Sequence, residues 1–284
     1  AASFRFCLEN QVLGVGWRVG SDTPITCWAD YEAAASRGGT NISGVRYLKD
    51  RVRVNDLLWT RSPEGNYYLA RVISEWEYLG SPQATAADVV NVVRCQIQKV
   101  ASVDQVPGKI VACFRATRTI QRIAEEGAVR YSQHLWNTLT KSNDYEIQIQ
   151  ASNCLFTMLG AEATEDVVFL FLQWQGWLVV PNSRKADTMS YEFYLVHRET
   201  RERAVVQVKT GNSRLNSDDW LGRSERVFLF QSNGHYDGAS SSRVECLQPK
   251  AVETFMRSHR DLLPESTLFW LDYSVPQGLI PEPK

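Results

Sequence analysis

The sequence has little of what marks several common classes of protein. Its 284 residues include only four histidines, and its six cysteines are scattered, with no CxxC pair and no histidine at zinc-finger spacing. Neither a disulfide framework nor a structural zinc site is therefore expected, and unpaired thiols fit a reducing compartment. No apolar run approaches the roughly 18 residues of a membrane span. We expect a soluble, cytoplasmic protein that does not associate with membranes.

The sequence also lacks an excess of charge of either sign. Its 31 basic and 32 acidic residues give a formal net charge of -1, so composition alone predicts no polyanionic partner. The Gly14–Trp17 segment (GVGW) lacks the third glycine of a dinucleotide-binding loop. At this length the chain exceeds a usual single domain, and we expect two compact domains.

The first third of the chain predicts a small, mostly antiparallel β-barrel or curled sheet with one or two helices, in a domain over residues 1–116. Strand-like runs bounded by Gly, Pro, Asn or Asp are FRFCLEN, VRVNDLLWTR, NYYLARVISEWEYL, NVVRCQIQKV and GKIVACF. A helix is expected near residues 30–35. From Thr117 to Thr140 apolar residues recur at helical spacing, so we predict a helical linker over 117–160.

The remainder, residues 161–284, predicts an α/β domain with a central mixed sheet. A helix with Thr164 as its N-cap is expected to end at Gly176. Strands are predicted at WLVV, YEFYLV, AVVQVK, VFLFQ and RVECL, with a short helix near 217–221 and a longer one over about 250–262. The expected fold class of the whole chain is thus α/β and mixed β.

One lysine stands in a run that otherwise predicts a buried strand. Lys209 ends AVVQVK, where an unpaired ammonium would cost several kcal/mol if buried. Residues two apart share a strand face, so Gln207 and Lys209 project together. The charged HRETRER segment predicts a hairpin turn that brings Glu192 near both. A carboxylate, an amide oxygen and a lysine at one place can bind a hard divalent cation and contact a phosphate, as phosphodiester hydrolysis requires.

This segment resembles the PD-(D/E)XK nuclease superfamily, in particular the Mrr-like restriction endonucleases, whose third motif is often QxK. The resemblance covers about residues 162–247. It implies that Glu165, on the first helix, Glu192, opening the second strand, and the QxK pair Gln207 and Lys209 are catalytic. The usual second-strand acid is Asp, and Asp187, five residues upstream of Glu192, is an alternative.

The same resemblance implies Mg2+ or Mn2+ as cofactor, with Glu192, Gln207 and Val208 as metal ligands. Basic and polar residues nearby are candidates for contacts with DNA phosphates, namely Ser183, Arg184, Lys185 and Arg214, with Arg223 further downstream. A purely structural interpretation stays open, in which Glu192 and Lys209 form a cross-strand ion pair and an acidic helix start only complements the macrodipole.

Aromatic residues crowd the first domain. Trp17 follows a glycine-containing turn in LGVGW, and Asp56 and Trp59 stand at the entrance to a strand in VNDLLWTR. These segments resemble the PUA-like group that includes EVE, ASCH and YTH domains, over about residues 1–115. The resemblance implies a base-sized pocket with Trp17, Trp28 and Trp59 as walls and Asp56 as an edge contact. Core packing of the aromatic residues and a turn cap at Asp56 are the alternatives.

Together the two halves predict a modification-dependent, type IV-like restriction endonuclease. Its expected partner is double-stranded DNA carrying a modified base, such as that of an invading phage, and cutting both strands requires a homodimer or two binding events. One alternative is a non-cleaving protein that binds modified RNA or DNA on a degenerate nuclease fold. Another keeps the nuclease and makes the first domain a protein-interaction or sequence-specific DNA module.

Overall fold

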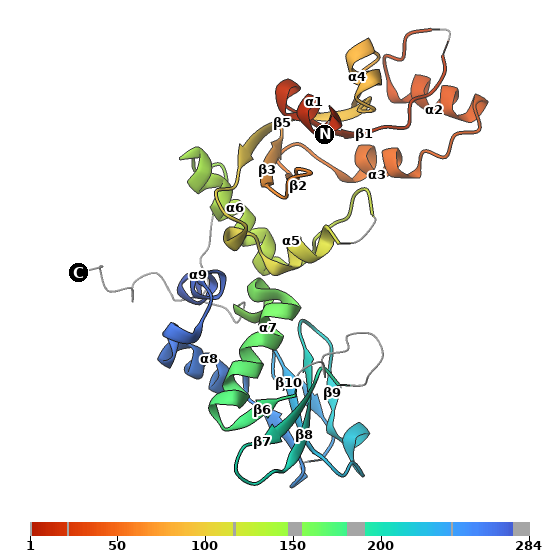
Figure 1. The fold of residues 1–284 in the computed structure, drawn as a ribbon. Helices are drawn as coiled ribbons and strands as arrows, with labels where there is room; N and C mark the ends of the chain where they lie inside the picture. The colour runs from red at the N-terminus through yellow and green to blue at the C-terminus, as the bar shows by residue number, and fades with distance from the viewer. Residues whose placement is uncertain are drawn as a thin grey trace. The chain divides into compact units, whose positions relative to one another are not determined.

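The computed structural model describes residues 2–21, 23–115, 118–146, 155–180, 191–239 and 241–274. The chain divides into two compact units (Figure 1), the first comprising Ala1–Val106 and Cys113–Ile147 and the second Pro107–Ala112 and Gln148–Lys284. Residues 117–160, which we expected to form a linker, are therefore divided between the two units. Within the described part of the chain, none of the helices combines the length and apolarity needed to cross a bilayer.

The first unit is built on a curled antiparallel sheet. Its long strand β5 (Asn91–Lys99) pairs through its first half with β1 (Val12–Val15) and β4 (Glu77–Tyr78), and through its second half with β3 (Tyr67–Val72). Strand β2 (Leu57–Arg61) lies beyond β3. The helical elements described in this unit are α1 (Ala2–Asn10), α2 (Trp28–Arg37), α3 (Ser43–Arg51), α4 (Pro82–Ala86), η1 (Val103–Gln105) and α6 (Glu126–Thr140).

Alternation along the strands gives this sheet two distinct faces. Ala70 and Cys95 point into a core that α2 and α3 supply with buried residues such as Tyr31 and Leu48, and Leu58 packs against the same core. Trp59, the next residue on β2, therefore points to the opposite face. There its indole Nε1 donates to the hydroxyl of Ser132 on α6, at 2.9 Å. Helices thus cover both faces of the sheet.

Two strand predictions in the first third of the chain are wrong. FRFCLEN lies in α1, and GKIVACF forms α5 (Gly108–Cys113), which directly follows Pro107, a residue suited to a helix start. Short apolar runs do not distinguish a strand from a buried helix. The helix near 30–35 is confirmed as α2. The helix expected from Thr117 is α6, which begins later because the Glu125 carboxylate accepts the first free N–H groups, from Gly127 and Ala128.

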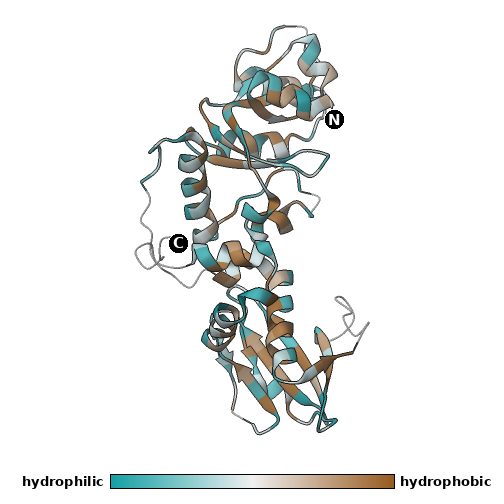
Figure 2. Ribbon diagram, turned by 60° about the vertical axis from the view of Figure 1, so that its left-hand side comes forward, coloured by the Kyte–Doolittle hydropathy of each residue, from teal (hydrophilic) through white to brown (hydrophobic). Residues whose placement is uncertain are grey.

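The second unit contains the predicted mixed sheet, in the order β12-β10-β8-β7-β6. Strands β6 (Trp177–Val179), β7 (Phe193–His197) and β8 (Arg203–Lys209) form an antiparallel meander. Strands β10 (Arg226–Gln231) and β12 (Val244–Leu247) follow, each parallel to its neighbour. Hydrophobic residues dominate the strands of this sheet (Figure 2), as expected for strands buried on both faces.

Different elements cover the two faces of the second sheet. Helix α7 (Leu155–Trp174) packs on the face that carries Phe193 and Phe230, through Phe169 and Phe156. On the other face, Val205 and Leu229 form a core with Leu215 and Trp220. The elements on that side are β9 (Leu215–Asn216), η2 (Ser217–Trp220) and β11 (Tyr236–Asp237), and the remaining helical elements are α8 (Pro249–Ser258), η3 (Arg260–Leu262) and α9 (Glu265–Tyr273).

Thr164 is not an N-cap, because α7 begins nine residues earlier, at Leu155. The helix changes direction at Gly160, whose φ of 78° is costly for residues with a Cβ. A Cβ on Gly160 would lie 2.9 Å from Cα of Gly108, so α5 and α7 approach through two glycines. The Thr164 hydroxyl instead donates to the Gly160 carbonyl at 2.6 Å. The helix ends at Trp174, and Gly176, with φ 96°, leads into β6.

Candidate functional site

Three polar side chains meet where β7 and β8 pair. The N–H of Glu192 donates to the Val206 carbonyl at 2.7 Å, so Glu192 extends the β7–β8 ladder opposite Gln207. Nε2 of Gln207 donates to Oε1 of Glu192 at 2.8 Å, and Nζ of Lys209 lies 3.9 Å from the same oxygen. The proximity expected from the hairpin is confirmed. We call Glu192, Gln207 and Lys209 the Glu192 cluster.

Burial within the Glu192 cluster differs from the sequence-based expectation. Lys209 is the last residue of β8, and its side chain is 46% exposed, so its ammonium stays in contact with water. Gln207 is the buried member, with 6% of its surface exposed. Its Nε2 also donates to the Val208 carbonyl at 3.2 Å. The Gln207 amide therefore holds the Glu192 carboxylate and a main-chain carbonyl together at the exposed end of the strand.

The Glu192 cluster offers oxygen ligands of the kind that Mg2+ and Mn2+ prefer. These are the Glu192 carboxylate, the Gln207 amide oxygen and the Val208 carbonyl, the expected metal ligands. The donor set fits a hard cation in ligand type, with one formal negative charge. Among the described residues no group of three or more histidine, cysteine or acidic side chains is placed to hold a metal ion.

Glu165 does not belong to the Glu192 cluster, because it lies on the other side of the sheet. It lies on α7, which covers the face of Phe193 and Phe230. The side chains of Glu192, Gln207 and Lys209 belong to the opposite face, because they alternate with those residues along the strands. The other expected residues Ser183, Arg184, Lys185 and Asp187 lie outside the described residues.

The two downstream arginines are engaged within the protein. Arg214 forms a bidentate pair with Asp237, with Nε 2.6 Å from Oδ2, and this pair holds the pKa of the Asp237 carboxyl below its usual value. Arg223 lies over the rings of Tyr191 and Trp220, at 5.7 and 5.0 Å from their centroids. Arg214 therefore does not offer a full uncompensated charge to a phosphate.

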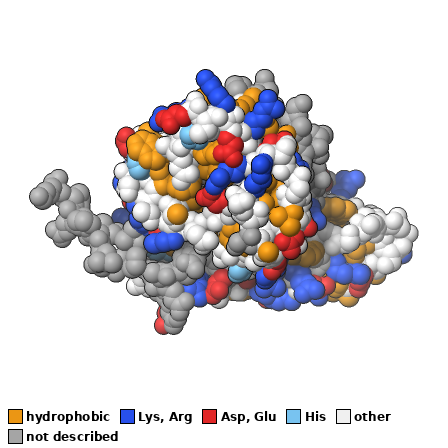
Figure 3. Space-filling view, turned by 90° about the horizontal axis from the view of Figure 1, so that it is seen from below, with side chains coloured by type: hydrophobic (Ala, Val, Ile, Leu, Met, Phe, Trp, Pro, Cys, Tyr) orange, Lys and Arg blue, Asp and Glu red, His pale blue; other side chains and the backbone are white. Residues whose placement is uncertain are grey.

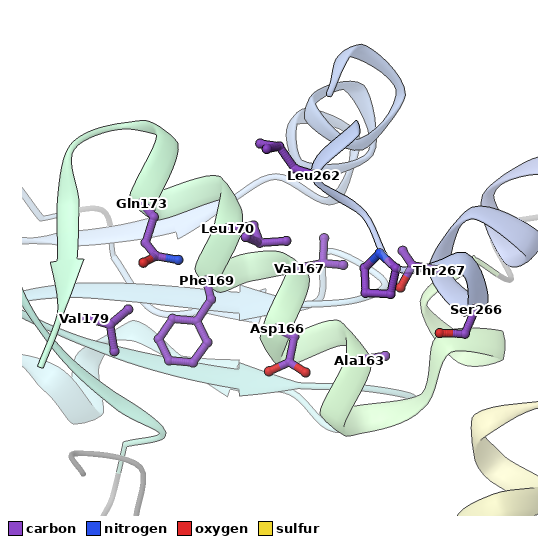
Figure 4. A pocket seen from close by; sticks show the side chains of 11 residues that line it. Ala163, Asp166, Val167, Phe169, Leu170, Gln173, Val179, Leu262, Ser266 and Thr267 are labelled. Atoms are coloured by element: carbon purple, nitrogen blue, oxygen red, sulfur yellow. The ribbon is translucent and has the colours of Figure 1, made fainter. Parts of the chain in front are cut away.

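A separate pocket of about 580 Å³ lies on the α7 side of the second unit (Figure 4). Asp166, Phe169 and Gln173 line it from α7, Leu262 from η3 and Thr267 from α9. No member of the Glu192 cluster lines it. Basic and acidic side chains are interspersed on the face seen in Figure 3, so the charges of that face largely compensate one another at long range.

The first unit contains a partly exposed aromatic cluster around Tyr31. Trp28 and Trp76 pack edge to face with centroids 5.1 Å apart, and Tyr31 lies 5.5 Å from both Trp28 and Tyr78. The Tyr31 hydroxyl donates to the Trp17 carbonyl at 2.8 Å, and Trp17 packs against the same core. We call these five residues the Trp28 cluster. Two of the predicted walls, Trp17 and Trp28, therefore belong together.

Asn91 is a residue that the sequence reasoning missed. It is fully buried and joins the Trp28 cluster, because its Nδ2 donates to the Gly16 carbonyl at 2.5 Å and its Oδ1 accepts from Trp76 Nε1 at 3.3 Å. An amide inside the apolar run Val89–Val93 was a usable signal, since buried polar groups require hydrogen-bond partners. The same rule, that a polar residue in an apolar strand requires a partner, singles out Lys209.

Trp59 and Asp56 are not part of the Trp28 cluster. Trp59 lies on the opposite face of the sheet, against Ser132, so the expected pocket with three tryptophan walls does not form. The exposed Asp56 accepts the N–H of Arg53 at 2.8 Å, which is the turn-capping role of the alternative interpretation. Asn55, beside Asp56, has a φ of 74°, a left-handed conformation that favours glycine.

The two clusters are the features from which function can be inferred. No family model, no curated protein and no solved structure matches the chain. The chemistry of the Glu192 cluster and of the Trp28 cluster therefore carries the functional inference.

Proposed function

We propose that the chain is a metal-dependent endodeoxyribonuclease of the type IV-like, modification-dependent kind, with a Mrr-like PD-(D/E)XK catalytic unit. The observation that carries the proposal is the contact of Glu192 with both Gln207 and Lys209, at 2.8 and 3.9 Å, at the exposed end of β8. The element order around it, a helix followed by an antiparallel hairpin and then a parallel strand, supports the resemblance stated from the sequence.

Each member of the Glu192 cluster has a distinct role in this proposal. Glu192, Gln207 and the Val208 carbonyl hold the cation, and the amide of Gln207 fixes the Glu192 carboxylate in its orientation. A bound Mg2+ or Mn2+ supplies neutralisation of phosphate charge and acidifies a water. The exposed Lys209 side chain orients the attacking water and stabilises the charge that develops on the phosphate oxygens.

The Trp28 cluster is the proposed reader of the modified base, in a unit of the PUA-like kind. Trp28 and Trp76 are partly exposed, and base stacking on an aromatic side chain contributes about 1–3 kcal/mol per base. Lys49 on α3 lies with its Nζ 5.5 Å from the Trp28 ring centroid and 3.0 Å from Oδ1 of Asp50, so its charge beside the rings is partly compensated. A homodimer on double-stranded DNA would supply one active site for each strand.

A non-cleaving nucleic-acid binding protein is the second candidate. The position of Glu165 on the α7 face of the sheet favours this second candidate, because among the described residues it leaves the Glu192 cluster with a single carboxylate. In that case the Glu192–Lys209 contact is a structural ion pair, and the Trp28 cluster alone carries the function. Metal-dependent nicking separates the two candidates.

The test is cleavage of matched plasmids that are unmodified, methylated at adenine, methylated at cytosine, or hydroxymethylated at cytosine. Each is incubated with Mg2+ or Mn2+, with chelator as the blank and Lys209→Ala as the inactive control. Cutting of one modified substrate that is lost in Lys209→Ala supports the proposal. If no substrate is cut but modified DNA is still bound, the non-cleaving candidate replaces it.

A further inference from the structure

A buried glutamine forms hydrogen bonds with the loop that follows Lys209, residues 210–214 (TGNSR). Gln231 pairs in register with Lys209 on the neighbouring parallel strand and is fully buried. Its Nε2 donates to the carbonyls of Gly211 and Ser213, at 2.7 and 2.8 Å. Its Oε1 accepts hydrogen bonds from the N–H groups of Asn233 and His235, so both the nitrogen and the oxygen of its amide are engaged.

These contacts determine which way the loop presents its N–H groups. In a trans peptide the carbonyl and the following N–H point in opposite directions. Because the carbonyls of Gly211 and Ser213 point to Gln231, the N–H groups of Asn212 and Arg214 point away from it, and both residues are exposed. Within the described part of the chain, neither N–H donates to another protein group.

Outward-pointing main-chain N–H groups are donors of the kind that anion sites in proteins use. Gly211 has a φ of 71° at the start of this turn, and the exposed ammonium of Lys209 immediately precedes it. The N–H of Gly211 itself is used by the Ser232 hydroxyl at 3.1 Å, and the Ser232 N–H donates to the Lys209 carbonyl. The loop is therefore anchored on one side and open on the other.

We propose that loop 210–214 is a phosphate-binding site whose ligand is a phosphodiester of the DNA backbone next to the Glu192 cluster. Only the choice of DNA as the source of the phosphate rests on the proposed function. The Arg214 guanidinium adds little, because Asp237 already neutralises it. The main-chain N–H groups and Lys209 bind the phosphate, and Asp237 limits the affinity.

The direct test follows the backbone amides of the wild-type protein by transverse-relaxation-optimised NMR, without divalent metal. Inorganic phosphate is titrated first, and an unmodified DNA duplex second. The expected result is a saturable shift of the Asn212 and Arg214 amides with both probes. Shifts with inorganic phosphate only would restrict the site to free phosphate, which overturns the assignment to DNA. No shift with either probe overturns the site itself.

A matched pair of variants tests the N–H group apart from the side chain. Asn212→Pro removes the N–H, and Asn212→Ala keeps it. We expect about tenfold weaker duplex binding for Asn212→Pro, since hydrogen bonds to charged groups contribute most, and unchanged binding for Asn212→Ala. Asp237→Asn should bind more tightly, because Arg214 is released. Equal binding by all three and the wild type overturns the proposal.

This binding assay separates the loop from the nuclease proposal. Binding is measured without metal, so the loop proposal stands if the Asn212 variants differ as expected even when no plasmid is cut. Conversely, if Asn212→Pro still cleaves DNA and binds it with unaltered affinity, the phosphate-binding proposal for the loop is rejected and the nuclease proposal stands. If Asn212→Pro does not fold, the wild-type amide titration decides the question.

Discussion

Replacing Lys209 by alanine separates a catalytic lysine from a structural one, because the structure predicts a small effect on stability. The Lys209–Glu192 distance of 3.9 Å corresponds to about 1 kcal/mol of Coulomb energy in water. The side chain is 46% exposed, and measured exposed pairs contribute about 0.2–1 kcal/mol. For a unit of this size, a loss below about 1 kcal/mol lowers Tm by less than about 4 °C.

The expected effect of Lys209→Ala on cleavage is much larger. If the ammonium stabilises developing phosphate charge, its removal should slow cleavage by about a hundredfold or more, as loss of one charge-stabilising donor does in other enzymes. The assay pairs a thermal melt with initial rates of plasmid nicking under saturating metal. Lys250→Ala is the matched control, because Lys250 forms a comparable exposed pair with Glu253, at 3.3 Å, on α8.

Two outcomes would refute this reasoning. A drop in Tm well above 4 °C with cleavage retained would make Lys209 a structural ion-pair partner. Equal loss of cleavage in Lys250→Ala would show that the effect is not specific to the Glu192 cluster. The expected pattern is a near-wild-type melt for both variants and loss of cleavage for Lys209→Ala alone.

Three further predictions concern the scaffold around the two clusters. Trp28→Leu should weaken binding of modified DNA by about 1–3 kcal/mol, whereas Trp59→Phe, on the other sheet face, should leave it unchanged; fluorescence anisotropy with modified and unmodified duplexes measures both. Hydrogen bonds from Thr26 and Cys27 lower the pKa of Asp30 to about 2. A carboxyl with a lowered folded-state pKa stabilises the fold above its unfolded pKa and loses this effect as pH falls toward 2. Asp30→Asn should therefore melt below the wild type at pH 7, and the difference should disappear as pH falls through about 2. Gly160→Ala should cost more than about 1 kcal/mol in urea unfolding, because its φ is 78° and α5 leaves no room for a Cβ.

The Glu192 cluster could be predicted from the sequence because two local rules determine it. The period of two along a strand put Gln207 and Lys209 on one face, and a short charged hairpin brought Glu192 beside them. Both rules depend only on neighbouring residues. The exposure of Lys209 could not be read in the same way, since it depends on where β8 ends relative to the rest of the sheet.

The errors arose where distant parts of the chain decide the outcome. Alternation places Leu58 and Trp59 on opposite faces of the sheet. Which of these two residues lies on the side of the Trp28 cluster depends on where α2 and α3 pack, and no local sequence pattern gives that packing. The α5 segment reads equally well as strand or helix, and its contact with Gly160 is made about fifty residues away in sequence. Single residues of unusual type were thus easier to recognise from the sequence than the side chains that surround them.

The charge of the Glu192 cluster gives a reason why DNA would be part of the metal site. Glu192 supplies the one negative charge of the cluster and Lys209 a positive charge 3.9 Å from it, so the cluster is formally neutral before a divalent cation with two positive charges binds. Under the proposed function, a phosphodiester would contribute a further negative charge when DNA binds. Metal and DNA should therefore raise each other's affinity by the same factor, as linkage requires. A cluster with a single carboxylate would in this way hold its cation tightly only on DNA.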